Sequence, residues 1–390
     1  MKNENRRDIS IYVHWPFCLS LCPYCDFNSH VGGQIDQQQW LKSYIKEINY
    51  FAYKIKGRNV ASIFFGGGTP SLMQPYVVEG IINEIVKLAR LDPLCEISLE
   101  ANPTSYEATK FQGFKQAGIN RISLGIQSLK DSDLRGLGRK HSAKEAIAAI
   151  KSASTIFSNY SFDLIYARPN QTLKEWQEEM KLALELAGSH ISLYQLTIEK
   201  GTPFFTLFRN KQMILPADDV SANMYEWTND YLNSNSYQRY EISNYAKVGS
   251  ECKHNLCYWN YGEYVGIGPG AHSRLHGEAL VETCMMLHPP TKWLESVAKN
   301  NHGIQLKSKL TTTELVEEII MMGTRLASGI SDDVLYQLAG LRFNDALHLE
   351  TTEQYGKQGL LSLQNNILRL TEQGLLLHNY IVPRILTQIP

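Results

Sequence analysis

Three of the seven cysteines stand within eight residues, as Cys18-x3-Cys22-x2-Cys25, and the other four are scattered along the chain. Thiolates at this spacing, with no obvious fourth ligand beside them, fit an iron–sulfur cluster that keeps one iron open. Zinc is the main alternative, since a closed zinc site would have to recruit His14, His30 or a distant cysteine. A disulfide is less favoured because nothing marks the chain as secreted.

Glycine and polar residues follow the predicted strands that come after this loop. The segment Gly66-Gly67-Gly68-Thr69-Pro70 ends a strand, and its glycines would let the backbone approach a ligand closely. Glu100 ends the next strand, where its carboxylate can accept hydrogen bonds from hydroxyl groups or from an ammonium. Gln127 ends the strand after that. The pattern predicts a binding site built from strand ends.

The elements that must position these residues alternate between strand and helix. Six βα units indicate a parallel sheet, and polar signals after strand upon strand favour a partial (β/α)6 barrel over an open doubly wound sheet. We expect strands at 9–15, 60–65, 96–99, 121–126, 162–166 and 191–196, and helices from 36, at 76–91, 106–117, 143–153 and 172–186.

The character of the chain changes after residue 200. We expect an aromatic-rich helix at 217–232, a strand at 239–243, and a site-lining loop at 244–270 that is crowded with Tyr, Trp, Gly, Cys and His. The sequence thus predicts a barrel at 1–200, a β/loop extension at 201–300, and a small C-terminal helical, winged-helix-like domain at 301–390, with helices at 314–326 and 332–338 and a wing near 367–377.

Composition narrows the class of protein. The 390 residues are 43% hydrophobic and 20% charged, which fits a globular protein with a large core. The formal net charge of -1 shows no excess of positive charge for binding nucleic acid. Residues 1–8 lack the apolar core of a signal peptide, and no stretch is long and apolar enough to span a bilayer, so we expect a cytoplasmic protein. No residue pattern decides between a monomer and a homodimer.

The cysteine motif, with Tyr24 before its last cysteine, resembles the cluster loop of the radical S-adenosylmethionine (SAM) superfamily. The resemblance implies that Cys18, Cys22 and Cys25 hold three irons of a 4Fe-4S cluster, while SAM chelates the fourth iron through its amino and carboxylate groups. The glycine-rich segment is similar to the one that binds the SAM amino group, and Arg139 matches the arginine that meets the carboxylate. By resemblance, SAM-contacting positions are Tyr12, Tyr24, Gly67, Gly68, Thr69, Glu100, Gln127, Arg139 and Asp163.

Within the superfamily, nearly the whole chain resembles the HemN and HemW group. The motifs are Cys22-Pro-Tyr-Cys-Asp-Phe-Asn-Ser29, Asp163-Leu-Ile-Tyr166 and Gly266-Ile-Gly-Pro-Gly-Ala-His272. HemN-type dehydrogenases carry a further cysteine two residues after the third and a sizeable N-terminal extension. This chain has Phe27 at that position, and only ten residues precede Ile11. We therefore do not expect this chain to share the decarboxylase activity of HemN-type dehydrogenases.

The segment His254-Asn-Leu-Cys-Tyr-Trp259 resembles the His-Asn-x-x-Tyr-Trp motif associated with heme binding in HemW heme chaperones. A neutral imidazole suits heme iron, so the resemblance implies His254 as the axial ligand, with Cys257 as a thiolate alternative and Tyr258 and Trp259 as flat apolar surface for the porphyrin. His272 and His276 are further candidates for contact with a propionate or with the iron.

The favoured hypothesis is a heme chaperone that holds a 4Fe-4S cluster and SAM, binds heme, and passes it to an acceptor hemoprotein such as one of the respiratory chain. On this hypothesis the protein is a carrier rather than a catalyst. The alternative is an oxygen-independent coproporphyrinogen III dehydrogenase of porphyrin biosynthesis, which decarboxylates tetrapyrrole propionates by radical chemistry. A radical methyltransferase or a heme-degrading enzyme is less favoured.

Overall fold

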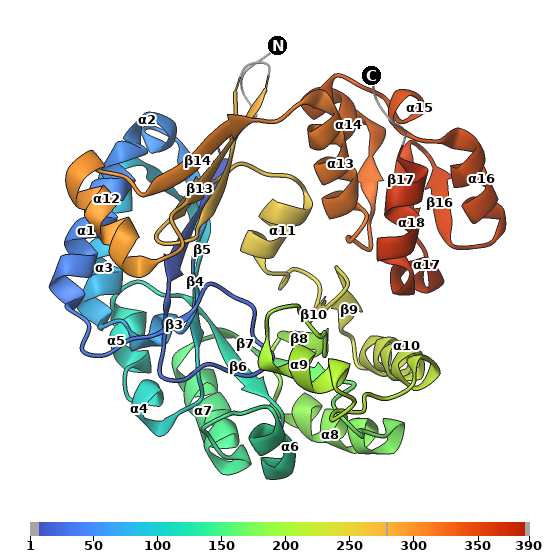
Figure 1. Ribbon diagram of the computed structural model, residues 1–390, viewed down its shortest axis with the longest axis horizontal. Helices are drawn as coiled ribbons and strands as arrows, with labels where there is room; N and C mark the ends of the chain where they lie inside the picture. Colours follow the sequence, from blue (N-terminus) through green and yellow to red (C-terminus); the bar gives the residue numbers. More distant parts are fainter. Residues whose placement is uncertain (1–7, 278–279, 387–390) are drawn as a thin grey trace.

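Within the described residues, 8–277 and 280–386, the computed structural model has six parallel strands at its centre (Figure 1). They pair in the order of the sequence, each parallel to the next, without the reversal of strand order that an open doubly wound sheet shows. The expected partial barrel is therefore confirmed. Its strands are β1 (Asp8–Trp15), β4 (Asn59–Gly67), β5 (Arg90–Ala101), β6 (Arg121–Gln127), β7 (Asn159–Tyr166) and β8 (His190–Gln195).

Helices follow these strands along one face, on the outside of the sheet in Figure 1. Two of them begin where the sequence predicts a cap: Asp36 accepts hydrogen bonds from the backbone of Gln38 and Gln39, and Thr172 forms a capping box. Ser142 forms a further capping box. The helices are α1 (Gln37–Tyr50), α2 (Ala52–Ile55), α3 (Pro75–Leu88), α4 (Ser105–Ala108), α5 (Phe111–Gln116), α6 (Asp131–Gly136), α7 (Ala143–Ile156) and α8 (Leu173–Leu186), with a 3-10 turn at Pro70–Leu72.

Two of the expected helices have different bounds. Helix α3 ends at Leu88, because Arg90 and Leu91 already pair with β4 as the first residues of β5. The helix expected at 106–117 is divided into α4 and α5. At the division, the Lys110 ammonium donates hydrogen bonds to the carbonyl oxygens of Ser71 and Met73. In both cases tertiary pairing overrides a helical pattern in the sequence.

Further strands extend the sheet at both ends. The order of the resulting twelve-stranded sheet in the described residues is β14-β13-β12-β11-β1-β4-β5-β6-β7-β8-β10-β9. Strand β11 is parallel to β1, and the next three strands are antiparallel. These elements are α9 (Pro203–Arg209), α10 (Asp218–Ser234), β9 (Gln238–Arg239), β10 (Asn244–Ala246), β11 (Tyr264–Ile267), β12 (His272–His276), β13 (Val281–Met286), α12 (Pro290–Asn300) and β14 (Ile304–Lys309).

Two expectations in this extension are wrong. Of the strand expected at 239–243, only Arg239 lies in a strand, as the last residue of β9. Residues 240–243 bend between β9 and β10, because the buried Glu241 carboxylate accepts hydrogen bonds from the Ser243 backbone and the Asn244 side chain. The segment 244–270 is not one loop but contains helix α11 (Lys253–Trp259) between β10 and β11. His254 and Tyr258, four residues apart, lie on one face of that helix and hydrogen-bond to each other.

The C-terminal part has its own hydrophobic core, which includes residues such as Val316, Ile319 and Ile381. A three-stranded antiparallel sheet in the order β15-β17-β16 packs with its helices, and the wing near 367 begins with a strand. The boundaries expected near residues 200 and 300 stay predictions. The elements are α13 (Thr312–Gly323), β15 (Ile330–Ser331), α14 (Asp332–Ala339), α15 (Phe343–Ala346), α16 (Leu349–Lys357), β16 (Leu361–Gln364), β17 (Ile367–Leu370), α17 (Glu372–Leu376) and α18 (His378–Ile385).

None of the helices in the described parts is both long enough and apolar enough to cross a membrane. The segment on which the expectation of no signal peptide rests lies almost wholly outside the described residues, since the description starts at Asp8.

A buried carboxylate joins the barrel to its extension. Glu47 on α1 is fully buried and accepts hydrogen bonds from the backbone of Gly268 (2.7 Å) and Gly303 (2.6 Å) and from the indole N–H of Trp293 (3.1 and 3.2 Å). Trp293 also stacks on Trp40, with ring centroids 5.2 Å apart. Burial raises the pKa of Glu47 to about 7, although the three donors oppose the shift.

This pKa predicts how stability changes with pH. Because the folded chain binds a proton at Glu47 more tightly than the unfolded chain does, stability falls as the pH rises from the ordinary glutamate range to about 7. We expect the Tm of the wild type to fall between pH 5 and pH 8 by a few degrees more than that of Glu47→Gln, a difference on the order of 1 kcal/mol. Thermal denaturation at each pH measures both profiles.

The matched control is Glu353→Gln, since Glu353 is an exposed carboxylate on α16 that forms an ion pair with Lys357 (2.8 Å). The control should keep the slope of the wild type. Parallel profiles for the wild type and Glu47→Gln would contradict the prediction. Glu47→Gln should also lower the Tm at every pH, because an amide cannot accept hydrogen bonds at both of its terminal atoms.

Candidate functional site

The three clustered cysteines lie on the segment that follows β1. Two short paired strands, β2 (Phe17–Cys18) and β3 (His30–Val31), close the base of this cysteine loop, and a turn brings the Cys25 N–H to the Cys22 carbonyl at 3.1 Å. All three thiols are free and partly exposed. Burial raises the pKa of Cys18 and Cys25, so a bound metal would have to displace their protons.

One cavity gathers the cysteine loop and the carboxyl ends of β4 to β7. Because these strands are parallel and consecutive, their ends lie on one rim. The cavity contains every residue predicted for the cluster and for SAM except Tyr12: Cys18, Cys22, Tyr24, Cys25, Gly67, Gly68, Thr69, Glu100, Gln127, Arg139 and Asp163. We call it the cofactor cavity. Among the described residues, no three His, Cys, Asp or Glu side chains are already placed to hold a metal ion, the three thiols included, so the cluster assignment rests on the cysteine spacing and on the lining of the cavity.

The glycine-rich strand end brings backbone close to the loop. A Cβ at Gly68 would come within 2.8 Å of the Phe17 carbonyl oxygen, and Gly67 has a φ of +110°, so side chains are excluded at both positions. The Thr69 hydroxyl donates to the Cys18 sulfur at 3.3 Å and accepts from the Asn102 amide at 3.0 Å. The loop and the strand ends are thus held together by direct contacts.

Two half-buried acids, Glu100 and Asp163, line the cofactor cavity. Burial and the neighbouring Asp163 raise the pKa of Glu100 to about 8, while a hydrogen bond from the Gly67 backbone opposes the shift. Burial also raises the pKa of Asp163 to about 6, against the opposing effect of a hydrogen bond from Ser192 and the charge of Arg121. A cation that enters the cavity would be attracted to the ionised acids and would lower both pKa values.

Arg139 brings a fixed positive charge to the same cavity. Its guanidinium donates to the Asn102 side chain (2.5 Å), the Gly125 carbonyl (2.7 Å) and the Cys22 sulfur (3.4 Å). Its Nε is buried without a hydrogen-bond partner among the described residues. Gln127 beside it has a φ of +70°, a strained conformation for a residue other than glycine. An anionic group such as a carboxylate would satisfy the free donor.

Among the lining residues that sequence reasoning did not predict are Asn102 and Ser123, which make hydrogen bonds to predicted ones. Asn102 connects Thr69 to Arg139, and Ser123 hydrogen-bonds Asp163 at 3.4 Å. Asn102 follows Glu100 by two residues at the same strand end, and this position in the sequence could have identified it as a site residue. Ser123 lies within β6, where only the alternation of the strand could have pointed it inward.

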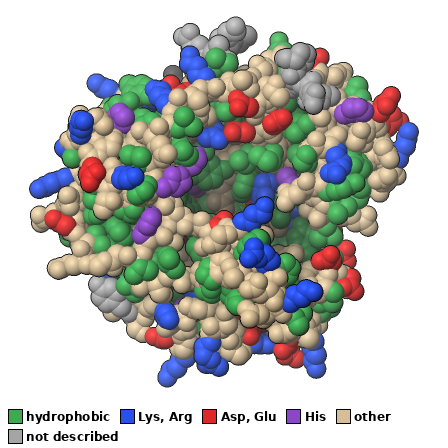
Figure 2. Space-filling model, in the orientation of Figure 1, with side chains coloured by type: hydrophobic (Ala, Val, Ile, Leu, Met, Phe, Trp, Pro, Cys, Tyr) green, Lys and Arg blue, Asp and Glu red, His purple; other side chains and the backbone are tan. Residues whose placement is uncertain are grey.

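A second cavity of about 360 Å³ lies beside the first and shares Phe27, Gly67 and Glu100 with it. It contains the predicted Tyr12. We call it the aromatic cavity, because four of its side chains are Tyr12, Phe27, Tyr258 and Tyr264; the other lining residues include His14, Asn28, His272 and His288. Figure 2 shows a central hollow with hydrophobic walls and histidines gathered on one side.

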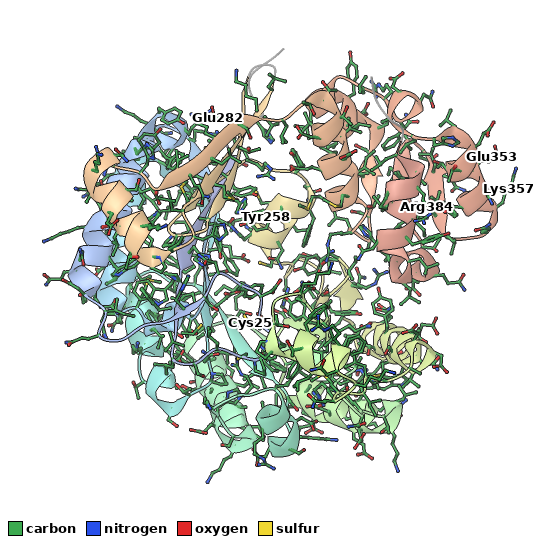
Figure 3. All side chains as sticks on the ribbon, in the orientation of Figure 1. Cys25, Tyr258, Glu282, Glu353, Lys357 and Arg384 are labelled. Atoms are coloured by element: carbon green, nitrogen blue, oxygen red, sulfur yellow. The ribbon has the colours of Figure 1, made fainter. Side chains whose placement is uncertain are left out.

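The structure separates the three residues predicted to bind heme. Tyr258 lines the aromatic cavity and, like Cys25 on the cysteine loop, lies near the centre of the molecule (Figure 3). His254 is buried below it, with Nδ1 2.8 Å from the Ser62 hydroxyl and Nε2 2.9 Å from the Tyr258 hydroxyl. Burial lowers the pKa of His254 to about 3, so its imidazole is neutral, and both ring nitrogens are occupied.

Trp259 lies on another side of α11, away from the aromatic cavity. The Arg325 guanidinium stacks over its ring at 4.4 Å, and Trp259 lines a cleft against the C-terminal part instead. In Figure 1, α11 stands between the barrel strands and α13, which agrees with this contact. Trp259 therefore joins two parts of the fold. Of the residues predicted to contact heme, Tyr258 and the further candidate His272 line the aromatic cavity, whereas His254 and Trp259 do not.

Known proteins share this architecture. The radical SAM superfamily model matches residues 12–183, and the HemN C-terminal domain model matches residues 310–377. The E. coli coproporphyrinogen III oxidase (HemN), described as a radical SAM enzyme, superposes with a TM-score of 0.80 over 97% of this chain and 90% of its own. Its sequence is 22% identical, so this likeness shows the fold alone.

Two relatives match over nearly their whole length. The chain is 34% identical over 390 residues to the mitochondrial radical S-adenosyl methionine domain-containing protein 1 of Danio rerio, with 98% of this chain and 88% of the relative covered. It is 32% identical over 382 residues to the heme chaperone HemW of Bacillus subtilis, with 97% and 100% covered. To HemW of Haemophilus influenzae it is 42% identical over 273 residues, 68% of this chain and 70% of the relative.

The superfamily implies a 4Fe-4S cluster and SAM as cofactors. The cofactor cavity fits them, since it holds three thiols, a close-approaching glycine backbone, two acids and an arginine with an unpaired buried N–H. The chain therefore belongs to the radical SAM superfamily, within the family that includes HemW of Bacillus subtilis and the radical S-adenosyl methionine domain-containing protein 1 of Danio rerio.

Proposed function

We propose that this protein is a heme chaperone, which binds heme and transfers it to an acceptor hemoprotein. The observation that carries the proposal is the alignment with HemW of Bacillus subtilis, which covers that heme chaperone completely. The aromatic cavity supports it, because tyrosine and phenylalanine rings offer the flat apolar contact that a porphyrin requires. We expect the acceptor to be a protein such as a respiratory-chain hemoprotein and the place of action to be the cytoplasm.

The cofactor cavity would hold the cluster on Cys18, Cys22 and Cys25. When bound, the cluster and SAM supply one-electron chemistry. The chain itself would orient SAM. Glu100 would accept hydrogen bonds from a cationic group of SAM. The Arg139 guanidinium, which Asn102 and Gly125 already hold in place, would donate hydrogen bonds to the SAM carboxylate. The Thr69 hydroxyl holds the Cys18 sulfur in place, and this sulfur would coordinate one iron of the cluster.

The alternative function, oxidative decarboxylation of coproporphyrinogen III, is less favoured. Its support is the likeness to HemN, which extends to the fold only. Phe27 lies in the wall between the two cavities, where the resemblance to HemN-type dehydrogenases would place a further cysteine. An apolar ring at that position gives a porphyrin contact area but supplies no thiol.

The cluster assignment predicts the effect of Cys22→Ala. Removing one of three thiolates should abolish the visible absorbance of the anaerobically reconstituted cluster and most of the bound iron and sulfide. The control is Cys284→Ala, because Cys284 is a buried thiol of β13 outside the cofactor cavity and should keep the cluster. An unchanged iron content in Cys22→Ala would contradict the assignment.

The raised pKa of Glu100 predicts that SAM binds more tightly as the pH rises. The pKa is about 8 in the free cavity, and a cationic ligand favours the ionised carboxylate, so binding near neutral pH must release a proton. We expect affinity to increase by up to about tenfold between pH 7 and pH 8.5, since one pKa unit corresponds to roughly 1.4 kcal/mol. Equilibrium binding of SAM to the cluster-loaded protein measures this.

Glu100→Gln serves as the comparison for that experiment. The amide keeps the shape of the side chain but cannot ionise, so the variant should bind SAM weakly and with a flatter pH profile. Ionisation of SAM itself affects both proteins alike, and the difference between the profiles isolates Glu100. Identical pH dependence in the two proteins would remove Glu100 from the SAM site.

The carrier hypothesis predicts heme binding without tetrapyrrole conversion. We expect the cluster-loaded protein to bind one heme per chain in an absorbance titration that follows the Soret band. A parallel anaerobic assay with SAM, reductant and coproporphyrinogen III should yield no decarboxylated product. Efficient conversion together with an absence of heme binding would overturn the proposed function in favour of the alternative.

A further inference from the structure

Two histidines of the aromatic cavity have imidazole rings available to a ligand. His272 begins β12, and His288 follows the end of β13, its antiparallel partner strand. Both side chains are exposed and line the cavity. Unlike the nitrogens of His254, their ring nitrogens make no hydrogen bond within the described residues. They therefore differ from His254 in the property that an axial ligand needs, a free nitrogen lone pair.

Both histidines stand at the same end of the hairpin that β12 and β13 form. His272 pairs with Met285 of β13, three residues before His288. Arg274 of β12 donates two hydrogen bonds to the Glu318 carboxylate (2.8 Å each), which fixes the hairpin against α13.

A rigid framework holds this pair against the cysteine loop. The Asn28 side chain donates to the carbonyl oxygens of Pro269 (3.0 Å) and His288 (3.1 Å), so the loop is tied to both strand ends that carry the histidines. Gly270 has a φ of +74°, and a Cβ there would come within 2.5 Å of the Asn28 amide. The spacing between loop and hairpin is thereby fixed.

The cavity wall suits a planar metal complex. Tyr258 and Tyr264 pack edge to face, with ring centroids 4.6 Å apart, and Phe27 is 65% exposed on the loop side. No lysine or arginine lines the cavity in the described part of the chain, so an anionic edge would have to face the solvent. Aromatic walls with an imidazole on one side match a metalloporphyrin, whose faces are apolar and whose carboxylates lie on one edge.

We propose that the aromatic cavity is the heme-binding site and that the His272 and His288 pair, not His254, supplies the imidazole to the iron. This inference rests on the proposed function and adds the location and ligand. His254 then has a positioning role: its Nε2 lies 2.9 Å from the Tyr258 hydroxyl and fixes that ring in the cavity wall. The site also places heme beside Glu100 and Gly67, which line the cofactor cavity as well.

The test compares histidine variants of the cluster-loaded, full-length protein in titrations with hemin under anaerobic conditions. We expect the double variant His272→Ala/His288→Ala to bind hemin at least about tenfold more weakly, because even the loss of a residue that only hydrogen-bonds a metal ligand costs that much affinity. Its absorbance spectrum should no longer show histidine-ligated heme. Added imidazole should restore that spectrum. His254→Asn should weaken binding less and keep the ligated spectrum, because it removes no iron ligand.

The matched control is His348→Asn, which removes another exposed imidazole while keeping a side chain that can cap α16. It should bind hemin as the wild type does. Iron and sulfide content and the Tm of each variant show whether it has folded and holds its cluster.

The outcomes separate the two proposals. If the wild type binds no heme, the proposed function fails. If the wild type binds heme, and the folded double variant keeps its affinity and ligated spectrum while His254→Asn loses them, heme binding stands and the location proposed for its ligand is wrong. Loss in the double variant with rescue by imidazole supports the assignment.

Discussion

Parallel pairing in the order of the sequence is the constraint on which the rest of this structure depends. Six strands, β1 and β4 to β8, run side by side in parallel, so all of their carboxyl ends meet on one rim. Glu100, Gln127 and Asp163 are far apart in sequence, yet they line one cavity because each stands at or near the end of its own strand. The cysteine loop completes the cavity because it directly follows the first strand.

A partial barrel leaves its interior open on one side, and α11 closes part of that opening. Cys252, just before the helix, donates to the Glu96 carboxylate at 3.3 Å, and the His254 backbone contacts the same oxygen at 3.4 Å. Arg121 lies across from Glu96 at 3.9 Å in the same buried polar layer. Polar groups buried in this way must be paired, which explains why both nitrogens of His254 are engaged.

Patterns that arise locally were predictable from the sequence. The caps Asp36 and Thr172 begin their helices as predicted, and the cysteine spacing, with the strand-end residues, predicted the contents of the cofactor cavity. The placement of the 254–259 segment was not predictable, because its composition suits an exposed loop as well as a buried helix. Contacts with Ser62 and Phe64, nearly two hundred residues away, decide that His254 is buried.

The wall between the two cavities gives them a physical connection. Glu100 and Gly67 face both sides, and the Glu100 carboxyl has a pKa of about 8, so its charge is sensitive to what surrounds it. A cation on one side favours the carboxylate, whereas an apolar plane on the other side removes water and favours the neutral acid. By linkage, occupants of the two cavities must affect each other's affinity equally and in the same direction. A half-buried acid shared by both walls thus provides a route by which occupation of the cofactor cavity can influence binding in the aromatic cavity.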